Sequence, residues 1–529
     1  MKRIITSILL LGVMMPLGAQ TVWDAWTFSQ NNYYGTARTV GLGNAVTAVG
    51  GDLGTVEFNP AGAAVAPYSQ FVLTPAITVT VSSVQGQKLS EADTSPYCFQ
   101  NLEKSSRTAF KVPNFGFMLN MDTGRIRGIR NWTFGFIGHA QNNFTNSLLA
   151  TGTNAETSLA GALATASYGY TTDQLKESWY DGDASWRSRL AYQSGIIDTY
   201  NGLASDYIGV TECLLDDGSI SLYDIINQEY GARRRGNKYD LITNLAFNVS
   251  DRFFFGANIG IVSMTYRAEE YWLEQEQTPF EIQYASGETS HFDYLRMRYS
   301  IEDMGSGIYA KAGFLWRVFG GLRLAAAIQT PTGFSITERY GYDAKTVYTE
   351  SNYNRSVSTP EDEWDYGFTS PWLFNLGLAY TLGDFALLSV DYEQCDYGSM
   401  HFNGHGYTDF SNTNNEISAI MGVQRNVRAG AEVRVLPTIA VRAGYNYSTH
   451  PMKNYINGDR SAYSFGLGYS SPGSFFADFA LRMTTQPEEH LNIYEDYIYD
   501  AAGNLTAASP TVNINSTLVD ALFTVGWRF

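Results

Sequence analysis

The residues that could carry out catalysis are few and do not converge. A serine-type hydrolase needs a serine, a histidine and a carboxylate or amide brought together, and the chain contains no motif of that kind. His139 lies in an alternating stretch with Phe134 and Phe136, which favours a hydrogen-bonding residue on the inner face of a strand over a catalytic base. The other five histidines lie mostly in or beside expected loops, without the spacing of metal ligands. We therefore predict no enzyme activity and no metal site.

Cysteines and acidic residues add little chemistry. Cys98, Cys213 and Cys395 are too few and too scattered for a disulfide scaffold, although a Cys98–Cys213 bridge stays open. The acidic stretch 361–365 could bind calcium, but an exposed acidic loop is the favoured interpretation. The formal net charge of -17 argues against a nucleic-acid partner, because phosphate binding needs clustered Lys and Arg.

The pair Gly41 and Gly43 could belong to a dinucleotide-binding loop. Such a loop needs a third glycine or alanine at the position of Val46, and a preceding strand inside a βαβ unit. Both requirements fail, so no cofactor is predicted.

The first residues indicate a secretory signal peptide, residues 1–19. Lys2 and Arg3 give a basic start, residues 4–17 an apolar stretch, and Leu17-Gly18-Ala19 a small-residue cleavage site. The mature chain is expected to begin near Gln20, and no cysteine follows that could carry a lipid anchor.

Alternation of apolar with small or polar residues is the strongest pattern in the remaining chain. It runs through 372–380, 427–435 and 438–447, where Arg and Glu occupy some of the alternate positions. No later run of about 18 apolar residues occurs, so helical membrane spans are not expected. The 36 Tyr, 30 Phe, 10 Trp and 50 Gly, with only 16% charged residues, suit the aromatic girdles of a membrane β-barrel.

A soluble β-sandwich also produces alternation, but strand length and the chain end favour a barrel. The strands run to roughly ten residues or more, as a tilted bilayer span requires, whereas sandwich strands are usually nearer five or six. The last strand places Phe523, Trp527 and Phe529 on one apolar face. A terminal aromatic resembles the signal by which outer-membrane barrels are delivered to their assembly machinery.

We predict an all-β fold, an antiparallel transmembrane barrel of about 14 strands, an even number as bacterial barrels require. The expected strands are 70–84, 107–121, 131–145, 236–249, 252–268, 289–318, 321–340, 366–382, 384–402, 423–436, 438–449, 460–471, 474–487 and 512–529. The stretch 289–318 is kept as one strand, kinked around Gly305 and Gly307. Short and long connections then alternate, which puts both chain ends on the periplasmic side. The largest loop is 146–235, with a candidate helix at 223–230.

Residues 20–69 are rich in Gly and Ala, lack strand alternation and precede the barrel of residues 70–529. These features indicate a plug, or hatch, within the lumen. Its signature residues are Arg38, Gly41, Gly43, Ala45, Gly50, Asp52, Asn59, Pro60, Ala61 and Gly62. This series, with Asn-Pro-Ala as its most specific part, resembles the FadL-type long-chain fatty-acid transporters of the Gram-negative outer membrane. The stretch 322–332, ending in Thr330-Pro331, is similar to a recurrent strand of that family.

The resemblance implies passive uptake of a hydrophobic molecule such as a fatty acid or hydrocarbon. The molecule would be captured among external loops, held in an apolar luminal pocket and released as the plug shifts, with exit through a gap in the wall. Candidate pocket residues are Phe385, Leu387, Phe476, Arg323 and Arg442, although each could instead pack against the plug or pair with luminal carboxylates. We expect a monomer in contact with outer-membrane lipid. The alternatives are a general or specific porin, a surface-binding barrel and an outer-membrane lipase.

Overall fold

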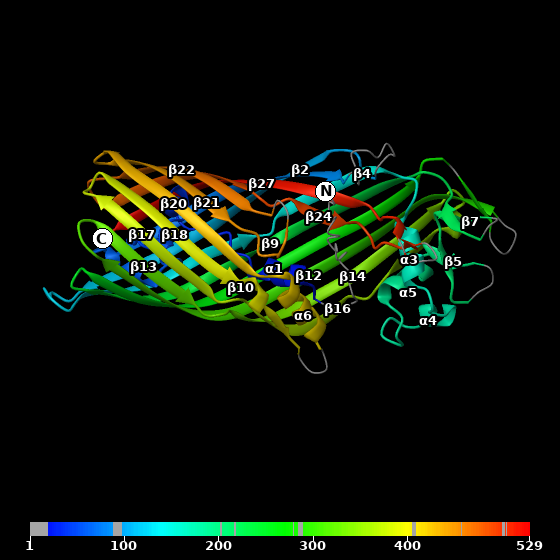
Figure 1. Ribbon diagram of the computed structural model, residues 1–529, viewed down its shortest axis with the longest axis horizontal. Helices are drawn as coiled ribbons and strands as arrows, with labels where there is room; N and C mark the ends of the chain where they lie inside the picture. The colour runs from blue at the N-terminus through cyan, green and yellow to red at the C-terminus, as the bar shows by residue number, and fades with distance from the viewer. Residues whose placement is uncertain are drawn as a thin grey trace, which may run out of the picture.

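The computed structural model describes residues 20–87, 98–200, 204–215, 218–278, 280–283, 289–404, 409–455, 458–499, 503 and 505–529. The expected signal peptide, residues 1–19, lies outside this part of the chain. One large antiparallel sheet closes on itself, because the first strand, β1 (Gln70–Gly86), pairs on one side with β2 (Glu103–Asp122) and on the other with the last strand, β27 (Thr511–Arg528). Figure 1 shows the resulting elongated barrel. Among the described helices, none is long and apolar enough to cross a membrane.

The barrel wall has 14 strand positions around its circumference, which confirms the predicted number and location of the strands. Some of these positions are filled by two strands that lie end to end. After β1 and β2 they are β3 (Ile129–Asn143) with β4 (Asn146–Asn154), β9 (Ile226–Val249), β10 (Phe253–Glu276), β12 (Thr289–Arg317), β13 (Leu322–Gln329) with β14 (Gly333–Tyr348), β17 (Leu373–Leu382) with β16 (Asp362–Thr369), β18 (Ala386–Asp396) with β19 (His401–Asn403), β20 (Val423–Leu436), β21 (Ile439–Ser448), β22 (Arg460–Ser470), β23 (Phe475–Thr485) with β24 (Glu489–Asn492), and β27.

The long stretch 289–318 forms one strand, as predicted. β12 pairs with β10 through Gly305 and Gly307 without a shift of register. The interruption lies instead in the neighbouring strand position, where Thr330-Pro331-Thr332 separates β13 from β14. Proline has no N–H to donate to the ladder, so a break at this position is expected physically.

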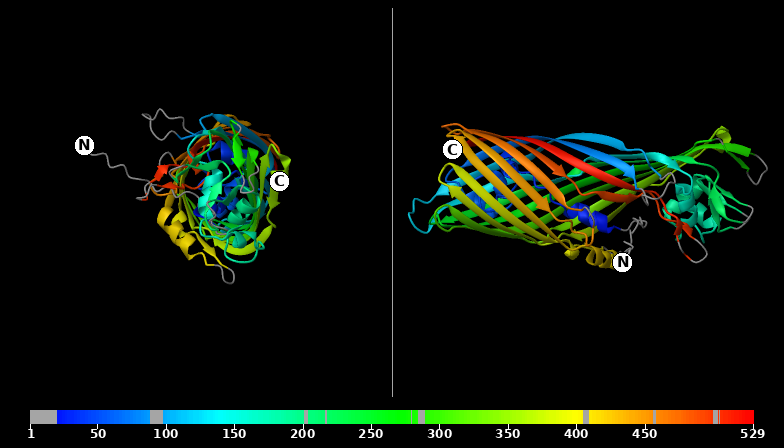
Figure 2. Two further views of the ribbon diagram at one scale, coloured as in Figure 1. Left: turned by 90° about the vertical axis from the view of Figure 1, so that its right-hand side faces the viewer. Right: turned by 45° about the horizontal axis from the view of Figure 1, so that its top comes forward.

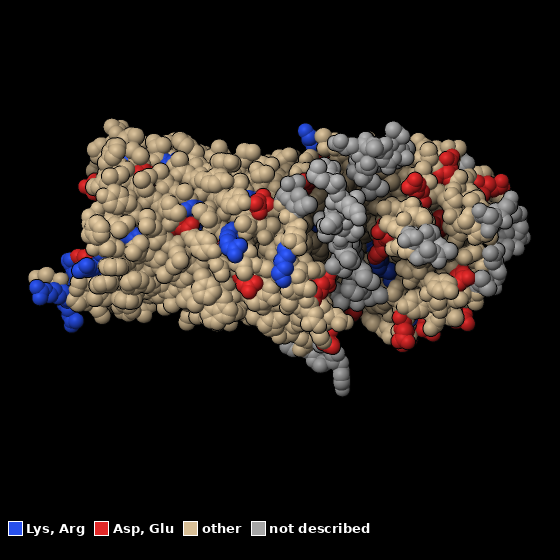
Figure 3. All heavy atoms as spheres, viewed as in Figure 1, with Lys and Arg blue, Asp and Glu red and all other residues tan. Residues whose placement is uncertain are grey.

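Alternation sorts the side chains between the outer surface and the lumen as predicted. In β17, Leu376 is 55% exposed whereas its neighbour Asn375 is 1% exposed. Figure 3 shows the consequence, a broad zone of uncharged surface over the end of the barrel that carries the short turns. On this face most acidic atoms lie towards the opposite end, and a group of Lys and Arg atoms lies at the outer tip of the end with the short turns. An apolar band of this kind is what contact with lipid requires.

The two ends of the barrel differ. The short connections and Phe529 lie at one end, and the other end carries a headpiece of helices and small hairpins (Figures 1 and 2). The headpiece contains α3 (Leu159–Ala166), α4 (Thr172–Lys176), α5 (Trp186–Gln193), β5 (Ile197–Thr199), β6 (Tyr207–Gly209), β7 (Glu212–Leu214) and β8 (Ile220–Leu222). Around this end lie β11 (Glu281–Gln283), η3 (Ser351–Tyr353), β15 (Arg355–Ser358), β25 (Ile498–Tyr499) and β26 (Leu505–Ala507).

Two expectations about the largest loop are wrong. Residues 146–154 continue the wall as β4, and β9 already begins at Ile226, so the connection is shorter than 146–235. The candidate helix 223–230 is therefore mostly strand. Both strands extend past the span that alternation marks, because Leu148 and Tyr230 pack in the apolar core of the headpiece.

The chain before β1 fills the lumen. It forms α1 (Val22–Ser29), α2 (Ala37–Gly41), η1 (Leu53–Thr55) and η2 (Pro60–Val65), with most of its side chains buried against the wall. α1 begins with a capping box in which Thr21 and Asp24 satisfy each other's backbone N–H. The side chain of Gln20 donates to Glu338 of β14 (2.6 Å). Residue 20 thus lies inside the barrel, and of the two ends of the predicted mature chain only Phe529 lies at the end with the short turns.

Candidate functional site

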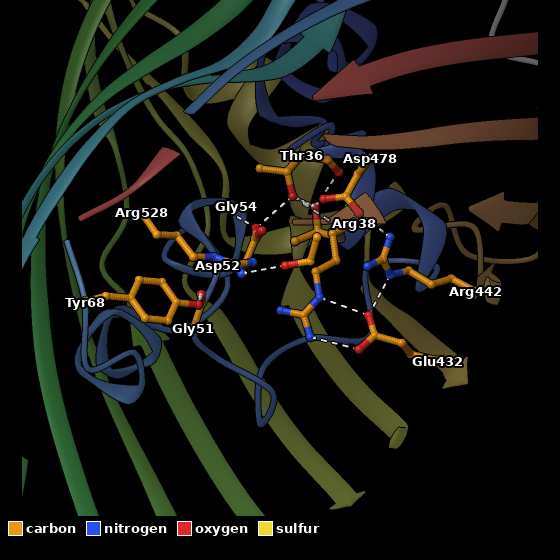
Figure 4. A network of polar contacts seen from close by, with 12 residues as sticks. Thr36, Arg38, Gly51, Asp52, Gly54, Tyr68, Glu432, Arg442, Asp478 and Arg528 are labelled. Carbon is orange, nitrogen blue, oxygen red and sulfur yellow. Dashed lines mark hydrogen bonds and ion pairs between the residues drawn. The ribbon is translucent and has the colours of Figure 1, made fainter. Parts of the chain in front are cut away.

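A chain of ion pairs around Glu432 fixes the plug to the wall (Figure 4). Arg38 Nε of α2 lies 3.0 Å from Glu432 Oε2 of β20, and Arg442 Nε of β21 donates to the same oxygen (2.6 Å). Arg442 Nη1 then donates to Asp478 Oδ1 of β23 (2.6 Å). All three wall residues are buried. Arg442 therefore takes the alternative role predicted for it, pairing with luminal carboxylates, and the plug residue Arg38 shares one of them.

Glycines allow the plug backbone to lie directly on the wall. A Cβ added at Gly444 of β21 would lie 2.0 Å from the backbone nitrogen of Gly43, and one added at Gly466 of β22 would lie 3.1 Å from the Cα of Gly41. Gly43 also has φ +62°, a conformation that favours glycine. The two plug glycines and the two wall glycines thus form one close contact that larger side chains would prevent.

The Asn-Pro-Ala-Gly sequence forms a second anchor. Asn59 Nδ2 donates to the carbonyl oxygens of Thr47 (2.9 Å) and Phe314 of β12 (3.1 Å), while its Oδ1 accepts from the N–H of Ala61 (3.0 Å). Pro60 stands at the start of η2, where a missing N–H costs nothing. One amide side chain therefore caps a turn, ties two parts of the plug together and binds the wall.

The other signature residues shape the interior of the plug. Asp52 Oδ1 accepts from the Thr36 hydroxyl (2.7 Å) and from the N–H of Gly54 (2.9 Å). A Cβ added at Gly50 would lie 2.6 Å from the Val65 side chain. The carbonyl of Gly62 accepts a hydrogen bond from the N–H of Gly51 (2.9 Å). Ala45 is fully buried. Asp52, Gly50 and Gly62 therefore make their contacts within the plug.

The structure does not bring the candidate pocket residues together as a pocket. Phe385 lies in the turn between β17 and β18, outside both strands, so the alternation of inward and outward side chains does not apply to it. Its ring is 63% exposed and does not face the lumen. Leu387 and Phe476 face inward but are buried in the cluster that packs on the plug. Arg323 Nη1 donates to the carbonyl of Val49 in the plug (2.7 Å). With Arg442 in the anchor network, the inward residues among these candidates hold the plug.

An apolar cluster rich in aromatic rings lies on the other side of the plug, towards the headpiece. Here the aromatic cluster means the buried residues Val22, Ala25, Trp26, Phe28, Val262, Met264, Tyr309, Phe334, Ile336, Tyr366, Phe368, Cys395, Tyr397, Met400, Phe402, Phe410, Ile417 and Met421. The Phe28 ring of α1 lies 6.0 Å from the ring of Phe368, which lies 5.0 Å from Phe402. Helix α1 thus occupies the lumen at this level. Alternation could not reveal the cluster, since its members come from the inner faces of six strands (β10, β12, β14, β16, β18 and β19), from α1 and from the connections after β18 and β19.

One seam of the wall is not hydrogen-bonded along its whole length. The ladder between β2 and β3 begins where Asp122 pairs with Asn131 and ends where Asn114 pairs with His139. The next residue of β2 beyond this end is Pro113, which has no N–H to donate. Next to Pro113 the plug takes the place of the ladder, and farther along Ser105 and Glu103 of β2 are hydrogen-bonded to Ser147 and Thr151 of β4. The N–H groups of Asn32 and Tyr34 donate to the carbonyls of Gln141 (2.8 Å) and Ala140 (3.4 Å) of β3. Plug residues therefore line this gap from inside.

The remaining candidates for chemistry stay separate. His139 is buried and lies on the luminal side near the plug. Cys98, Cys213 and Cys395 are free thiols. In the acidic stretch, Glu363 of β16 forms an ion pair with Arg339 of the neighbouring strand β14. Within the described residues, no group of three His, Cys, Asp or Glu side chains could hold a metal ion.

Comparison with known proteins identifies the fold. No protein-family model and no curated protein sequence matches the chain. Among solved structures, a FadL homologue of Pseudomonas aeruginosa is similar with a TM-score of 0.50 and 12% identity, covering 94% of this chain and 98% of that one. The toluene transporters TodX of P. putida (TM-score 0.49, 12% identity, 94% and 99% covered) and TbuX of Ralstonia pickettii (0.47, 13%, 94% and 99%) were also found. The chain has the FadL-type barrel fold.

Proposed function

With the FadL-type fold as premise, we propose that this chain is an outer-membrane channel for the passive uptake of hydrophobic molecules such as long-chain fatty acids. It stands in the membrane as a monomer, with its apolar band against lipid and its short turns in the periplasm. Its last strand, ending at Phe529, is the segment presented to the barrel assembly machinery.

The observation that carries this proposal is the aromatic cluster between the headpiece and the plug. A pathway for sugars or ions would be lined with charged and hydroxyl groups, whereas apolar solutes need apolar, largely aromatic walls. Phe334, Phe368 and Phe402 supply such walls at one level of the lumen. Helix α1 fills this level, so a solute passes only after α1 has moved.

The seam between β2 and β3 supplies the exit. A hydrophobic molecule gains nothing from entering the aqueous periplasm, because the transfer of apolar surface to water is unfavourable. Beyond Asn114 plug residues bridge the first part of the seam, where Tyr34 lies with the ammonium of Lys111 3.4 Å from its ring centre. Farther along, Ser105 and Glu103 of β2 are hydrogen-bonded to Ser147 and Thr151 of β4. A shift of Asn32 and Tyr34 would open a lateral path into the membrane.

A general porin is the second candidate, and the plug argues against it. Gly43 and Asn59 touch the wall too closely to leave a water-filled passage beside them. A surface-binding barrel has the large headpiece in its favour. The third alternative, an outer-membrane lipase, has no support from the sequence, which contains no motif that brings a serine, a histidine and a carboxylate together.

Transport into lipid vesicles tests the proposal. Purified protein in vesicles should pass toluene and a long-chain fatty acid but should not admit arabinose, which a porin would pass. Replacing Phe368 by Asp should slow the hydrophobic solutes at least ten-fold, because an ionised carboxylate makes the apolar site polar. The control Phe319→Asp changes an exposed ring in the turn between β12 and β13 and leaves both the lumen and the lipid-facing band intact. Entry of arabinose at the rate of the fatty acid would refute the channel proposed here.

A further inference from the structure

The wall of the barrel changes partner at the end of β18. This strand pairs with β20 up to Asp396, opposite Val423. The chain then forms the turn η4 (Tyr397–Ser399) and continues as β19, which pairs with β16. No strand pairs with the other edge of β19 within the described residues. The wall therefore ends here in a step, in a place far from the β2–β3 seam.

Helix α6 (Ser411–Ile420) covers this step from outside the ring of strands (Figure 2). Asn414 holds it to β19, accepting from the N–H of Phe402 (2.8 Å) and donating to its carbonyl (3.0 Å). Lys453 donates to the carbonyls of Ser418 (2.9 Å) and Ala419 (3.2 Å) at the end of the helix. The helix contributes one fully buried side chain, Ile417.

A groove of about 550 Å³ lies between the helix and the step. It is lined by Asp396, Gly398, Ser399, Ser418, Met421, Gly422, Val423, Arg425 and Lys453. Met421 is fully buried and belongs to the aromatic cluster, together with Tyr397 and Met400 from the same step. The floor of the groove is therefore continuous with the apolar interior in which α1 sits.

The charges of the groove lie at its outer edge. Arg425 and Lys453 are exposed cations, against the single carboxylate of Asp396. Below them on the outer wall, the apolar band continues with exposed Val390 of β18 and Val427 of β20. Two cations directly above an apolar band lie at the depth of lipid headgroups, where an anionic group attached to an apolar chain is stable.

We propose that this groove is an entrance for single-chain anionic amphiphiles, which reach the channel from the membrane surface. The carboxylate binds Arg425 and Lys453, and the chain passes Met421 into the aromatic cluster. This proposal rests on the proposed function, since it supplies the same lumen. It differs in route, because the substrate enters at the outer wall and bypasses the headpiece.

Photolabelling tests the site. The probe is a hexadecanoate with a diazirine near the chain end, and the comparison probe is the corresponding neutral alcohol, each added to vesicles that contain the wild-type protein. The expected label from hexadecanoate lies on the segment with Met421 or on Met400. Label confined to the headpiece would overturn the proposal, and so would equal labelling of the groove by a diazirine phospholipid, which would make it a site for bilayer lipid.

A charge reversal separates this site from the channel itself. Arg425→Glu should reduce hexadecanoate labelling at the groove at least ten-fold and leave the alcohol unaffected. Arg434→Glu, an exposed arginine near the other end of the same strand, is the matched control and should change neither. Unchanged hexadecanoate labelling in Arg425→Glu, with toluene uptake intact, refutes the entrance alone. A wild-type protein that passes no hydrophobic solute refutes the proposed function, and the entrance with it.

Discussion

Removing the carboxylate of Glu432 is the most direct test of how the plug is held. Glu432→Ala leaves Arg38 without its ion-pair partner and deprives Arg442 of one of its two carboxylates. Breaking a buried ion pair by deleting one partner costs about 3–5 kcal/mol. Arg38 is partly exposed, so the lower limit applies, and about 3 kcal/mol corresponds to a shift of about 100-fold in the equilibrium between held and released plug.

Single-channel recording in planar bilayers measures that shift. The wild type should show rare openings, and Glu432→Ala should open about 100 times more often with unchanged conductance per opening. Glu363→Ala is the control, because the Glu363–Arg339 pair is exposed on the outer wall and contributes no more than about 1 kcal/mol. If Glu432→Ala opens no more often than the control, the ion-pair network does not hold the plug, and the reasoning from burial fails.

Three further predictions concern the plug contact, a loop histidine and the chain end. Gly444→Ala should displace the plug and raise the opening frequency, since its Cβ would meet the plug backbone, whereas Gly473→Ala in an open turn should have no effect in the same recordings. Burial lowers the pKa of His450 to about 4, and its Nδ1 accepts from a backbone N–H (3.1 Å) while its ring packs against α1. Because the pKa of His450 is lower in the folded protein than in the unfolded chain, its contribution to the free energy of unfolding is full above about pH 6.5. This contribution falls as the pH drops towards 4, by about 2 kcal/mol after allowance for partial exposure. Thermal melts should show the loss in the wild type and in the control His401→Gln, which both contain His450, but not in His450→Gln. Deleting Phe529 should reduce the amount of folded barrel in the outer membrane several-fold, as measured by heat-modifiable gel mobility, and an undiminished amount would contradict the role of the terminal aromatic.

The strands could be predicted from sequence because each one satisfies a local rule. A residue pair such as Asn375 and Leu376 reveals the two faces of a strand without knowledge of its neighbours, and the strict alternation of short and long connections is an independent check on the number of strands. The plug could be predicted because residues 20–69 lack strand alternation, are rich in Gly and Ala and precede the first strand. Strand extension beyond the apolar band was missed, because the ends of β4 and β9 pack on the headpiece and no longer follow the lipid pattern.

The luminal site was much harder to predict. Its contacts join residues far apart in the chain, such as Arg38 and Glu432, and the inner face of a barrel strand mixes small, polar and aromatic residues. Glu432 was visible as an inward charge, but nothing local identified its partner. Leu387 and Phe476 were correctly placed inward, yet only the fold shows that the plug covers them. Helix α1 has no alternation and no long periodic pattern, so its position among the aromatic rings could not be anticipated.

The contact between Gly43 and Gly444 also constrains the order in which the molecule is assembled. The barrel closes by pairing its first strand with its last, and the plug is joined directly to the first. Its backbone lies directly against β20, β21 and β22, strands that are synthesised late. We therefore expect the plug to enter before β1 and β27 join, so that the glycine surface of β20, β21 and β22 is covered as the barrel closes. In this order of assembly, β20, β21 and β22 pack on a plug that is already in place.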